Sequence, residues 1–205
     1  MTLPTDTTTL TVRKATGDDR CALVDTLTVV FHDDPVFTWW VPDPQRRPVI
    51  LRSFFEVVVD VFQPHDELYV TEPDPISTAI WVPPGCQPSG EEGEQMVGWL
   101  VAAAAETADR LLTALELMEE QHPHDSHAYL FFVATLPQWQ SRGIGSALMR
   151  EVLDRCDRDG IPAYLEATSI DSQRLYLRHG FEVAGEILLP DGPSMWPMWR
   201  EPHRR

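Results

Sequence analysis

The sequence predicts a mixed α/β (α+β) fold in which helices cover a central sheet, and two observations lead to this fold class. Segments with helical and strand periodicity alternate along the chain. Residues 129–135, YLFFVAT, are nearly all apolar, which is typical of a strand covered on both faces. Of the 205 residues, 43% are apolar and 23% charged. This composition is typical of a soluble globular protein, and we expect residues 1–205 to form one domain.

The N-terminal half predicts three strands and several helices. A strand at residues 10–14 precedes a helix that opens at residues 17–19 and stops near Pro35. A second, very apolar helix begins at residues 43–44 and is ended by Pro64. Residues 68–71 and 76–82 read as a hairpin around a Pro-Asp-Pro turn. Residues 83–94 have the composition of a loop, and a long helical segment containing a break follows.

The C-terminal half continues the alternation. Pro137 ends the apolar strand, and helical spacing of apolar residues begins at Gly143 and stops at Gly160. A strand at 163–168, a short helix at 172–179 and a strand at 181–189 come next. The last strand contains Pro197, which cannot donate a backbone hydrogen bond and therefore requires a sheet edge or a bulge.

The stretch QWQSRGIGSALM, residues 138–149, lies where the apolar strand passes through a loop into a helix. The first amides of a helix have no intrahelical partner, and glycines let an anion approach them closely, so a diphosphate fits there. An ordinary tight loop is the alternative. The dinucleotide fingerprint fails because Leu148 occupies its third glycine position, and no Gly-Lys-Ser/Thr of a Walker phosphate loop is present.

Charge and composition restrict the partners. A net charge of −16 disfavours nucleic acid and favours a cationic small molecule. Neither a signal peptide nor a membrane-spanning run is recognisable, so we expect a cytoplasmic protein that does not bind membranes. Residues 122–127, HPHDSH, lack the spacing of metal ligands. We therefore expect no metal and a loop in which one imidazole hydrogen-bonds to main chain.

Three motifs in order resemble the GNAT acetyltransferase superfamily. Residues 140–145, QSRGIG, fit its acetyl-CoA pyrophosphate motif [Gln/Arg]-x-x-Gly-x-[Gly/Ala], and LEATS at 165–169 and LYLRHGF at 175–181 resemble its downstream motifs. The Asp34-Pro35 pair and the C-terminal stretch at 189–202 are similar to the branch that contains puromycin N-acetyltransferase. The resemblance implies a GNAT-like fold, with a mostly antiparallel mixed sheet of about six to seven strands that is splayed at the acetyl-CoA site.

The resemblance also implies which residues contact acetyl-CoA. Backbone groups of Val133, Ala134 and Thr135 would bind the pantetheine arm, and Ser169 stands where many members carry a CoA-contacting Asn. Tyr176 matches the tyrosine that protonates the departing thiolate and so also contacts the cofactor; a packed tyrosine is the alternative. The residues expected around the diphosphate are Gln140, Ser141, Arg142, Gly143, Ile144, Gly145 and Ser146.

The resemblance says less about the residues that contact the amine that accepts the acetyl group, which form the acceptor side of the site. Glu166 lies in a strand beside the expected acetyl position and is the predicted base, while a hydrogen-bonded strand residue is the alternative. Other carboxylates that could take the proton are Asp33, Asp34, Glu119 and Glu120. Asp34 could instead orient an ammonium group or simply cap the turn before Phe37. The predicted substrate-binding residues are Asp34, Trp40, Trp81 and Glu119, because aromatic faces and carboxylates attract cations.

The sequence therefore predicts an acetyl-CoA-dependent N-acetyltransferase acting on a primary amine of a small molecule, such as an aminonucleoside or an antibiotic. Two alternatives stay open: a catalytically silent acyl-CoA-binding regulatory module, and an acetyltransferase acting on a peptide or protein amine. Dimers are common in the superfamily, so a homodimer is one expected state.

Overall fold

The structure is a computed structural model that describes residues 10–203. Its first half contains three strands and five helices: β1 (Thr11–Lys14), α1 (Arg20–Phe31), α2 (Pro35–Trp40), α3 (Arg47–Phe62), β2 (Leu68–Glu72), β3 (Ser77–Val82), α4 (Gly90–Ala104) and α5 (Ala108–Gln121). The second half contains β4 (Ala128–Thr135), α6 (Ile144–Asp159), β5 (Ala163–Ala167), α7 (Ile170–Leu177), β6 (Glu182–Val183), β7 (Ile187–Leu188) and β8 (Ser194–Arg200).

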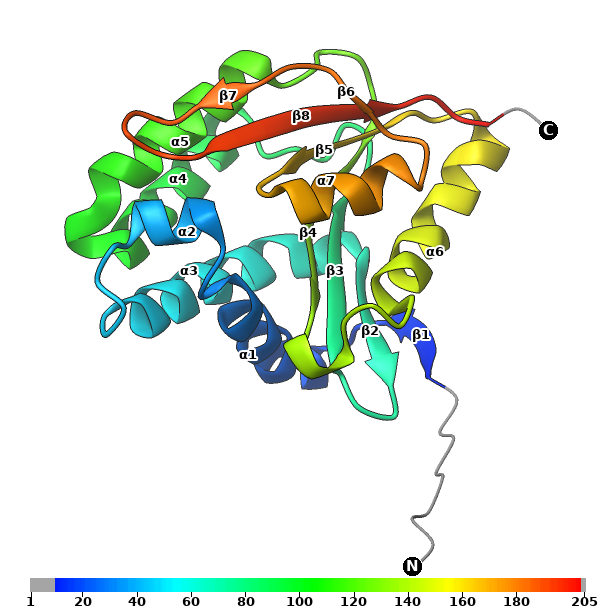
Figure 1. The fold of residues 1–205 in the computed structure, drawn as a ribbon, viewed down its shortest axis with the longest axis horizontal. Coiled ribbons are helices and arrows are strands. Elements are labelled where there is room, and N and C mark those ends of the chain that lie inside the picture. The colour runs from blue at the N-terminus through cyan, green and yellow to red at the C-terminus, as the bar shows by residue number, and fades with distance from the viewer. Residues whose placement is uncertain (1–9, 204–205) are drawn as a thin grey trace, which may run out of the picture.

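These strands form one sheet of eight strands in the order β1-β2-β3-β4-β5-β8-β6, with β7 paired to β8 (Figure 1). Every neighbouring pair is antiparallel except β4 and β5, which are parallel. The predicted fold class, a mostly antiparallel mixed sheet flanked by helices, is confirmed. The sheet has eight strands rather than six to seven because two short strands follow α7.

The parallel pair β4 and β5 separates soon after it begins. Its register covers only Ala128 with Ala163 and Tyr129 with Tyr164, whereas β4 stays paired with β3 as far as Thr135. The register between β3 and β4 shifts at Ile80/Trp81, so that Phe131 is an extra residue in β4. A bulge of this kind bends a strand and increases its twist, which turns residues 130–135 away from β5. The sheet is therefore splayed at this point.

Apolar side chains form a core on each face of the sheet. Helices α1 and α3 pack on one face, where Leu27 and Phe55 are fully buried, and α6 packs on the other with Leu148 and Met149 (Figure 1). The face that carries α1 also receives α2, α4 and α5. The two faces thus have separate cores. In the described residues no helix is both long and apolar enough to cross a membrane.

The structure differs from the sequence prediction at two segments that lie near prolines. The first helix stops near Pro35 as predicted, since α1 ends at Phe31, but the short helix α2 that begins at Pro35 was not predicted. Pro35 is its first residue, a position where the missing N–H costs nothing, and Asp34 caps it. The predicted strand at 181–189 is instead β6 and β7, separated opposite Pro197. Pro197 lies in the internal strand β8, and its carbonyl accepts from Ala184 N–H at 2.8 Å. The interruption between β6 and β7 accommodates the missing donor, so Pro197 needs no edge position.

Several helix and loop boundaries also differ from those predicted from the sequence. The loop predicted at 83–94 ends where α4 begins at Gly90, and the predicted start of the second helix at 43–44 moves to Arg47. The break in the long helical segment is confirmed at Ala105, whose φ is 50°. The apolar strand is less buried than predicted, since Phe131, Phe132 and Val133 are only half-buried. The divergence of β5 explains that exposure.

Candidate active site

The loop between β4 and α6 leaves the start of α6 open. Ser141 and Gly143 have left-handed backbone conformations, with φ of 60° and 79°. A Cβ added to Gly143 would have no heavy atom within 4 Å, so the space on that side of its backbone is open. The amides of the first turn of α6 have no intrahelical acceptor, and the helix dipole adds positive potential there. The start of α6 therefore presents a concave group of N–H donors, which suits an anion.

Side chains of the same loop fix its shape. Gln140 donates from Nε2 to the Thr135 carbonyl at 3.0 Å. The guanidinium of Arg142 stacks over the Trp139 ring at 4.8 Å and donates to the Gln138 carbonyl at 3.2 Å. These contacts tie the loop to the end of β4 and leave its backbone as the surface for a ligand.

The end of β4 offers backbone groups to the opening. Ser77 Oγ donates to the Ala134 carbonyl at 2.6 Å, and Leu136 N–H donates to the Ile76 carbonyl at 3.0 Å, so both residues face β3. Since backbone groups alternate sides along a strand, those of Val133 and Thr135 face the opening toward β5. The structure thus separates the three predicted pantetheine contacts. The Ala134 carbonyl has a partner on the β3 side, and the Thr135 carbonyl accepts from Gln140, so the backbone groups of Val133 and the N–H of Thr135 are left toward β5.

Tyr176, Asp34 and Thr168 come together at the opening. The Thr168 hydroxyl donates to Asp34 Oδ2, and Asp34 Oδ1 accepts from Val36 N–H at 2.9 Å at the start of α2. Burial raises the pKa of Asp34 above its ordinary value, although Thr168 and the α2 amides oppose this. Tyr176 is 8% exposed, and burial, followed by the charge of Asp34, raises the pKa of its phenol. The tyrosine is therefore protonated at neutral pH, close to a carboxylate that holds a proton unusually well.

Glu166 lies two residues before Thr168 and faces the same side of the sheet. Its carboxylate is 4% exposed and accepts from the Tyr129 hydroxyl at 2.7 Å. His122 Nδ1 lies 3.9 Å from its other oxygen. Glu119, at the end of α5, is near enough for its charge to act on Tyr129, and burial is the main reason why the pKa of that phenol is raised. Glu166 therefore lies among aromatic hydrogen-bond donors beside the splayed end of β5.

Sequence reasoning missed Thr168, Tyr129 and His122 as members of this site. Thr168 lies within the motif LEATS, and its position two residues after Glu166 was the available signal. The expected loop at 122–127 is confirmed in one respect, since His127 Nδ1 lies 2.6 Å from the Asp125 carbonyl. Between residues 10 and 203 the structure has no group of three or more His, Cys, Asp or Glu side chains arranged to hold a metal ion.

The two predicted aromatic wall residues are not brought together. Trp40 is 3% exposed, packs against Phe37 and Phe54, and donates from Nε1 to the Thr107 carbonyl at 3.0 Å. Trp81 is 1% exposed in the core on the opposite face. The two rings do not line one common pocket, because neighbouring helices bury each of them in a different core, and their contact with the acceptor stays a prediction.

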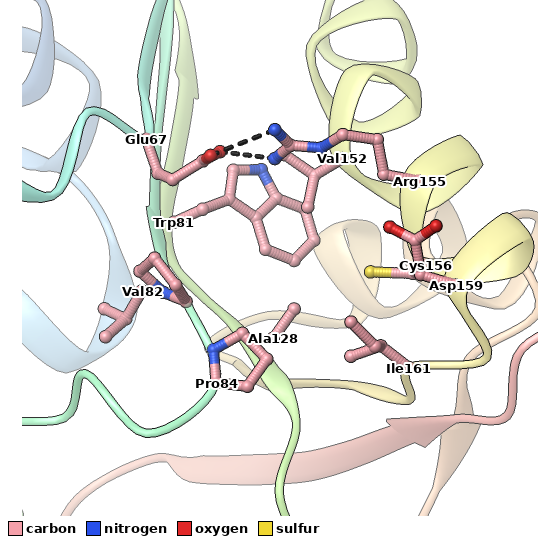
Figure 2. A pocket seen from close by; sticks show the side chains of 11 residues that line it. Glu67, Trp81, Val82, Pro84, Ala128, Val152, Arg155, Cys156, Asp159 and Ile161 are labelled. Atoms are coloured by element: carbon pink, nitrogen blue, oxygen red, sulfur yellow. Dashed lines mark hydrogen bonds and ion pairs between the residues drawn. The ribbon is translucent and has the colours of Figure 1, made fainter.

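Trp81 instead lines a separate cavity of about 210 Å³ between the end of β3 and the second half of α6. Figure 2 shows its indole ring beside the ion pair of Glu67 and Arg155, with Cys156 across the cavity. The cavity lies on α6 at least eight residues, or about 12 Å, beyond the start of that helix. It is thus distinct from the opening between β4 and β5.

Two predicted cofactor contacts use their hydroxyls within the protein. Ser169 caps α7, accepting from Ser172 N–H at 3.1 Å, and this cap explains a serine at that position without a ligand. Ser146, in the first turn of α6, lies 2.9 Å from His179 Nε2. Ile144 is buried, and Gly145 lies in the same turn, where an added Cβ would be 3.6 Å from Thr135 Oγ1. The predicted diphosphate residues thus form one continuous loop and helix start.

A splayed parallel pair beside an open helix start is the arrangement that the sequence resemblance implied. Residues 51–181, more than half of the chain, match the Acetyltransferase (GNAT) family. The chain therefore belongs to this family, and the predicted family is confirmed.

Individual relatives resemble parts or all of the chain. A mycothiol acetyltransferase of Brachybacterium faecium is 37% identical over 82 residues, which are 38% of this chain and 25% of the relative. An L-amino acid N-acetyltransferase of Escherichia coli is 33% identical over 70 residues, or 32% of this chain and 43% of the relative. The matches thus span less than half of either curated relative.

Solved structures match almost the whole chain. A structure described as histone acetyltransferase HPA2 and related acetyltransferase from Corynebacterium glutamicum has a TM-score of 0.70 at 30% identity, covering 96% of this chain and 98% of the other. Arylalkylamine N-acetyltransferase 2 of Aedes aegypti has a TM-score of 0.67 at 11% identity, covering 95% and 100%. At that identity the mosquito enzyme supports the fold alone.

Proposed function

We propose that the chain transfers the acetyl group of acetyl-CoA to a primary amine of a small molecule. The observation that carries the proposal is the opening between β4 and β5, which joins the open start of α6 to the cluster of Tyr176, Asp34 and Thr168. The free space before Gly143 and the unpaired side of β4 fit a diphosphate followed by an extended arm. Bound acetyl-CoA would supply an acetyl thioester that is already activated.

In this proposal the chain binds the two substrates side by side and moves two protons. Amides of residues 143–146 hold the diphosphate, and the backbone groups of Val133 and the N–H of Thr135 hold the arm, so that the thioester points toward Tyr176. Holding both reactants at contact distance supplies much of the acceleration. As the C–N bond forms and the C–S bond breaks, the Tyr176 hydroxyl donates its proton to the thiolate. The burial of Tyr176 keeps that proton available.

The second proton leaves the attacking nitrogen. Two carboxylates on the acceptor side are suited to receive it or to attract the ammonium form: Glu166, predicted from the sequence, and Asp34. Asp34 lies nearer to Tyr176, and its raised pKa brings it closer to the working range of a general base. We therefore assign proton acceptance to Asp34 and an electrostatic role on the acceptor side to Glu166, with Glu119 and Tyr129 beside it.

The acceptor class follows from charge. A net charge of −16 and the carboxylates near the opening favour a cationic amine and disfavour nucleic acid. The resemblance of residues 34–35 and 189–202 to the puromycin N-acetyltransferase branch favours an aminonucleoside or a related antibiotic amine. We accordingly place small primary amines ahead of peptide and protein amines.

The test combines binding with turnover. Calorimetry measures acetyl-CoA affinity, and a thiol reagent measures CoA release with a panel of amines that includes aminonucleosides, diamines and a peptide amine. We expect saturable binding and thiol release that depends on a small amine. Binding without release for any amine would instead identify a silent acyl-CoA module. The absence of binding at millimolar acetyl-CoA, with folded protein, would refute the proposal.

A further inference from the structure

His179 contacts the predicted diphosphate site from a different part of the chain. It follows α7 in the segment RHGF, and its Nε2 lies 2.9 Å from Ser146 Oγ in the first turn of α6. No role for this histidine was predicted from the sequence. The inference below rests on the proposed function, because it concerns the same binding site for acetyl-CoA.

The hydroxyl of Ser146 can act in two directions, since it has one proton and two acceptor lone pairs. When the imidazole donates to it, its own proton is free to point toward a ligand on the open side of the helix start. When the imidazole accepts from it, that proton is used within the protein. A protonated His179 can only donate to Ser146, because both of its ring nitrogens then carry hydrogen, whereas a neutral ring donates from Nε2 in only one of its two tautomers.

The surroundings of His179 favour the neutral imidazole before a ligand binds. Burial lowers the pKa of His179 first, and the positive charges of Arg150, Arg178 and Arg200 lower it further. Arg200 also donates from Nε to the His179 carbonyl at 2.8 Å and pairs with Asp157 at 2.8 Å. A bound diphosphate would place negative charge next to Ser146, and a nearby opposite charge favours the protonated form of histidine.

We propose that His179 is a positioning residue for the diphosphate: it takes up a proton from solvent when the ligand binds, donates Nε2–H to Ser146, and thereby directs the Ser146 hydroxyl proton to a phosphate oxygen. One proton enters the complex, and no covalent bond to carbon or phosphorus changes. The Ser146 hydroxyl then serves the diphosphate site at the start of α6 as a side-chain donor, in addition to the backbone amides.

The turn that follows α7 and contains His179 also holds Tyr176, the proposed acid. The backbone N–H groups of His179 and Phe181 both donate to the Tyr176 carbonyl, at 2.9 and 3.2 Å. A contact that fixes His179 against α6 therefore also fixes the end of α7 that carries Tyr176. Binding of the diphosphate at the start of α6 and placement of Tyr176 therefore both depend on this short segment.

The test measures protons taken up on binding. Dephospho-CoA is titrated calorimetrically at about pH 6.5 in two buffers with different ionisation heats, because this ligand lacks the 3′-phosphate that itself titrates nearby. We expect uptake of about half a proton by the unsubstituted protein and almost none by His179→Gln. Affinity should fall about 3- to 10-fold in His179→Gln, the effect of one hydrogen bond. His124→Gln, at an exposed histidine in the α5–β4 loop, is the matched control and should retain the full uptake.

Ser146→Ala keeps the imidazole and removes the bridge, so it should lose most of the uptake and should not be additive with His179→Gln in affinity. Circular dichroism checks that each variant is folded. Equal uptake in the unsubstituted protein and both variants would overturn the role of His179 while leaving the acetyl-CoA site intact. Failure of the unsubstituted protein to bind dephospho-CoA and acetyl-CoA would overturn the proposed function itself.

Discussion

At the scale of single residues, the proposed chemistry depends on how burial changes the groups at the opening. Tyr176 and Asp34 reach it from opposite halves of the sequence, and in both cases burial is the main reason that the pKa is raised. For the phenol this preserves the proton to be donated. For the carboxylate it raises the affinity for the proton to be received, which matches the needs of an acid and a base acting on one reaction.

Tyr176→Phe removes only the hydroxyl that we assign as the acid. We expect kcat to fall about 10²- to 10⁴-fold, with a much smaller change in the KM for acetyl-CoA, because the thiolate would leave without a proton donor. Steady-state kinetics across pH measures both constants. Tyr69→Phe, on another strand and bonded to Glu67, is the matched control and should retain activity. Unchanged turnover in Tyr176→Phe would refute the acid role.

The raised pKa of Asp34 predicts how stability depends on pH at this position. A carboxyl that binds its proton more tightly when folded favours folding at low pH, and this contribution is lost as pH rises through the folded pKa. Asp34→Asn should therefore raise the free energy of unfolding relative to the unsubstituted protein at about pH 7.5, with a smaller gain at about pH 5. Urea unfolding at both pH values measures the difference.

Activity should change in the opposite direction, because Asn cannot accept the proton. We expect Asp34→Asn to reduce kcat about 10²-fold or more. A variant that is less stable at neutral pH, or that keeps full activity, would contradict the assignment of Asp34 as a buried base. Glu166→Gln serves as the comparison, since it tests the other carboxylate of the acceptor side.

At the scale of elements, the start of α6 is where local conformation and ligand binding coincide. Gly143 has φ of 79° and precedes the first helical residue, so an L side chain would be strained there and would also project into the open space before the amides. Gly143 thus permits the left-handed turn and also keeps the start of α6 accessible to a ligand.

Gly143→Ala should weaken acetyl-CoA binding by about tenfold and lower stability by about 1 kcal/mol, the cost of a left-handed alanine. Gly98→Ala is the matched control, because Gly98 lies within α4 and an added Cβ meets nothing within 4 Å. That substitution should raise stability by about 0.5–1 kcal/mol through helix propensity and leave affinity unchanged. Calorimetry and urea unfolding measure the two effects. Equal affinity in both variants would remove Gly143 from the binding site.

At the scale of the whole molecule, negative charge dominates. The net charge of −16 causes self-repulsion in the folded state, which salt screens over about 10 Å at 0.1 M. Raising NaCl from about 0.01 M to about 0.3 M at neutral pH should therefore raise the Tm. The gain should shrink toward the sequence pI of about 4.6, where the net charge approaches zero. Calorimetric scans check this, and a Tm that falls with salt at neutral pH would contradict it.

The sequence could predict the fold class and the loop that leads from β4 into α6, because the elements on both sides of that loop have a recognisable local pattern. Helical spacing after Gly143 and the apolar strand before Pro137 are recognisable in short windows. The split of β6 from β7 was not, since it depends on Pro197 in the strand opposite. The contact of Asp34 with Thr168 and the burial of Trp40 and Trp81 in separate cores were also inaccessible, because each depends on residues distant in sequence.

The position of β8 has a consequence for synthesis. Among the described residues this strand comes last in sequence, yet it lies inside the sheet, pairing with β5 on one side and with β6 and β7 on the other. While the ribosome still holds residues 194–200, β5 has an unsatisfied edge and the two short strands have no template. The sheet therefore stays incomplete until residues 194–200 are available, and a protein cut short ahead of Ser194 would leave that edge free to associate with other chains.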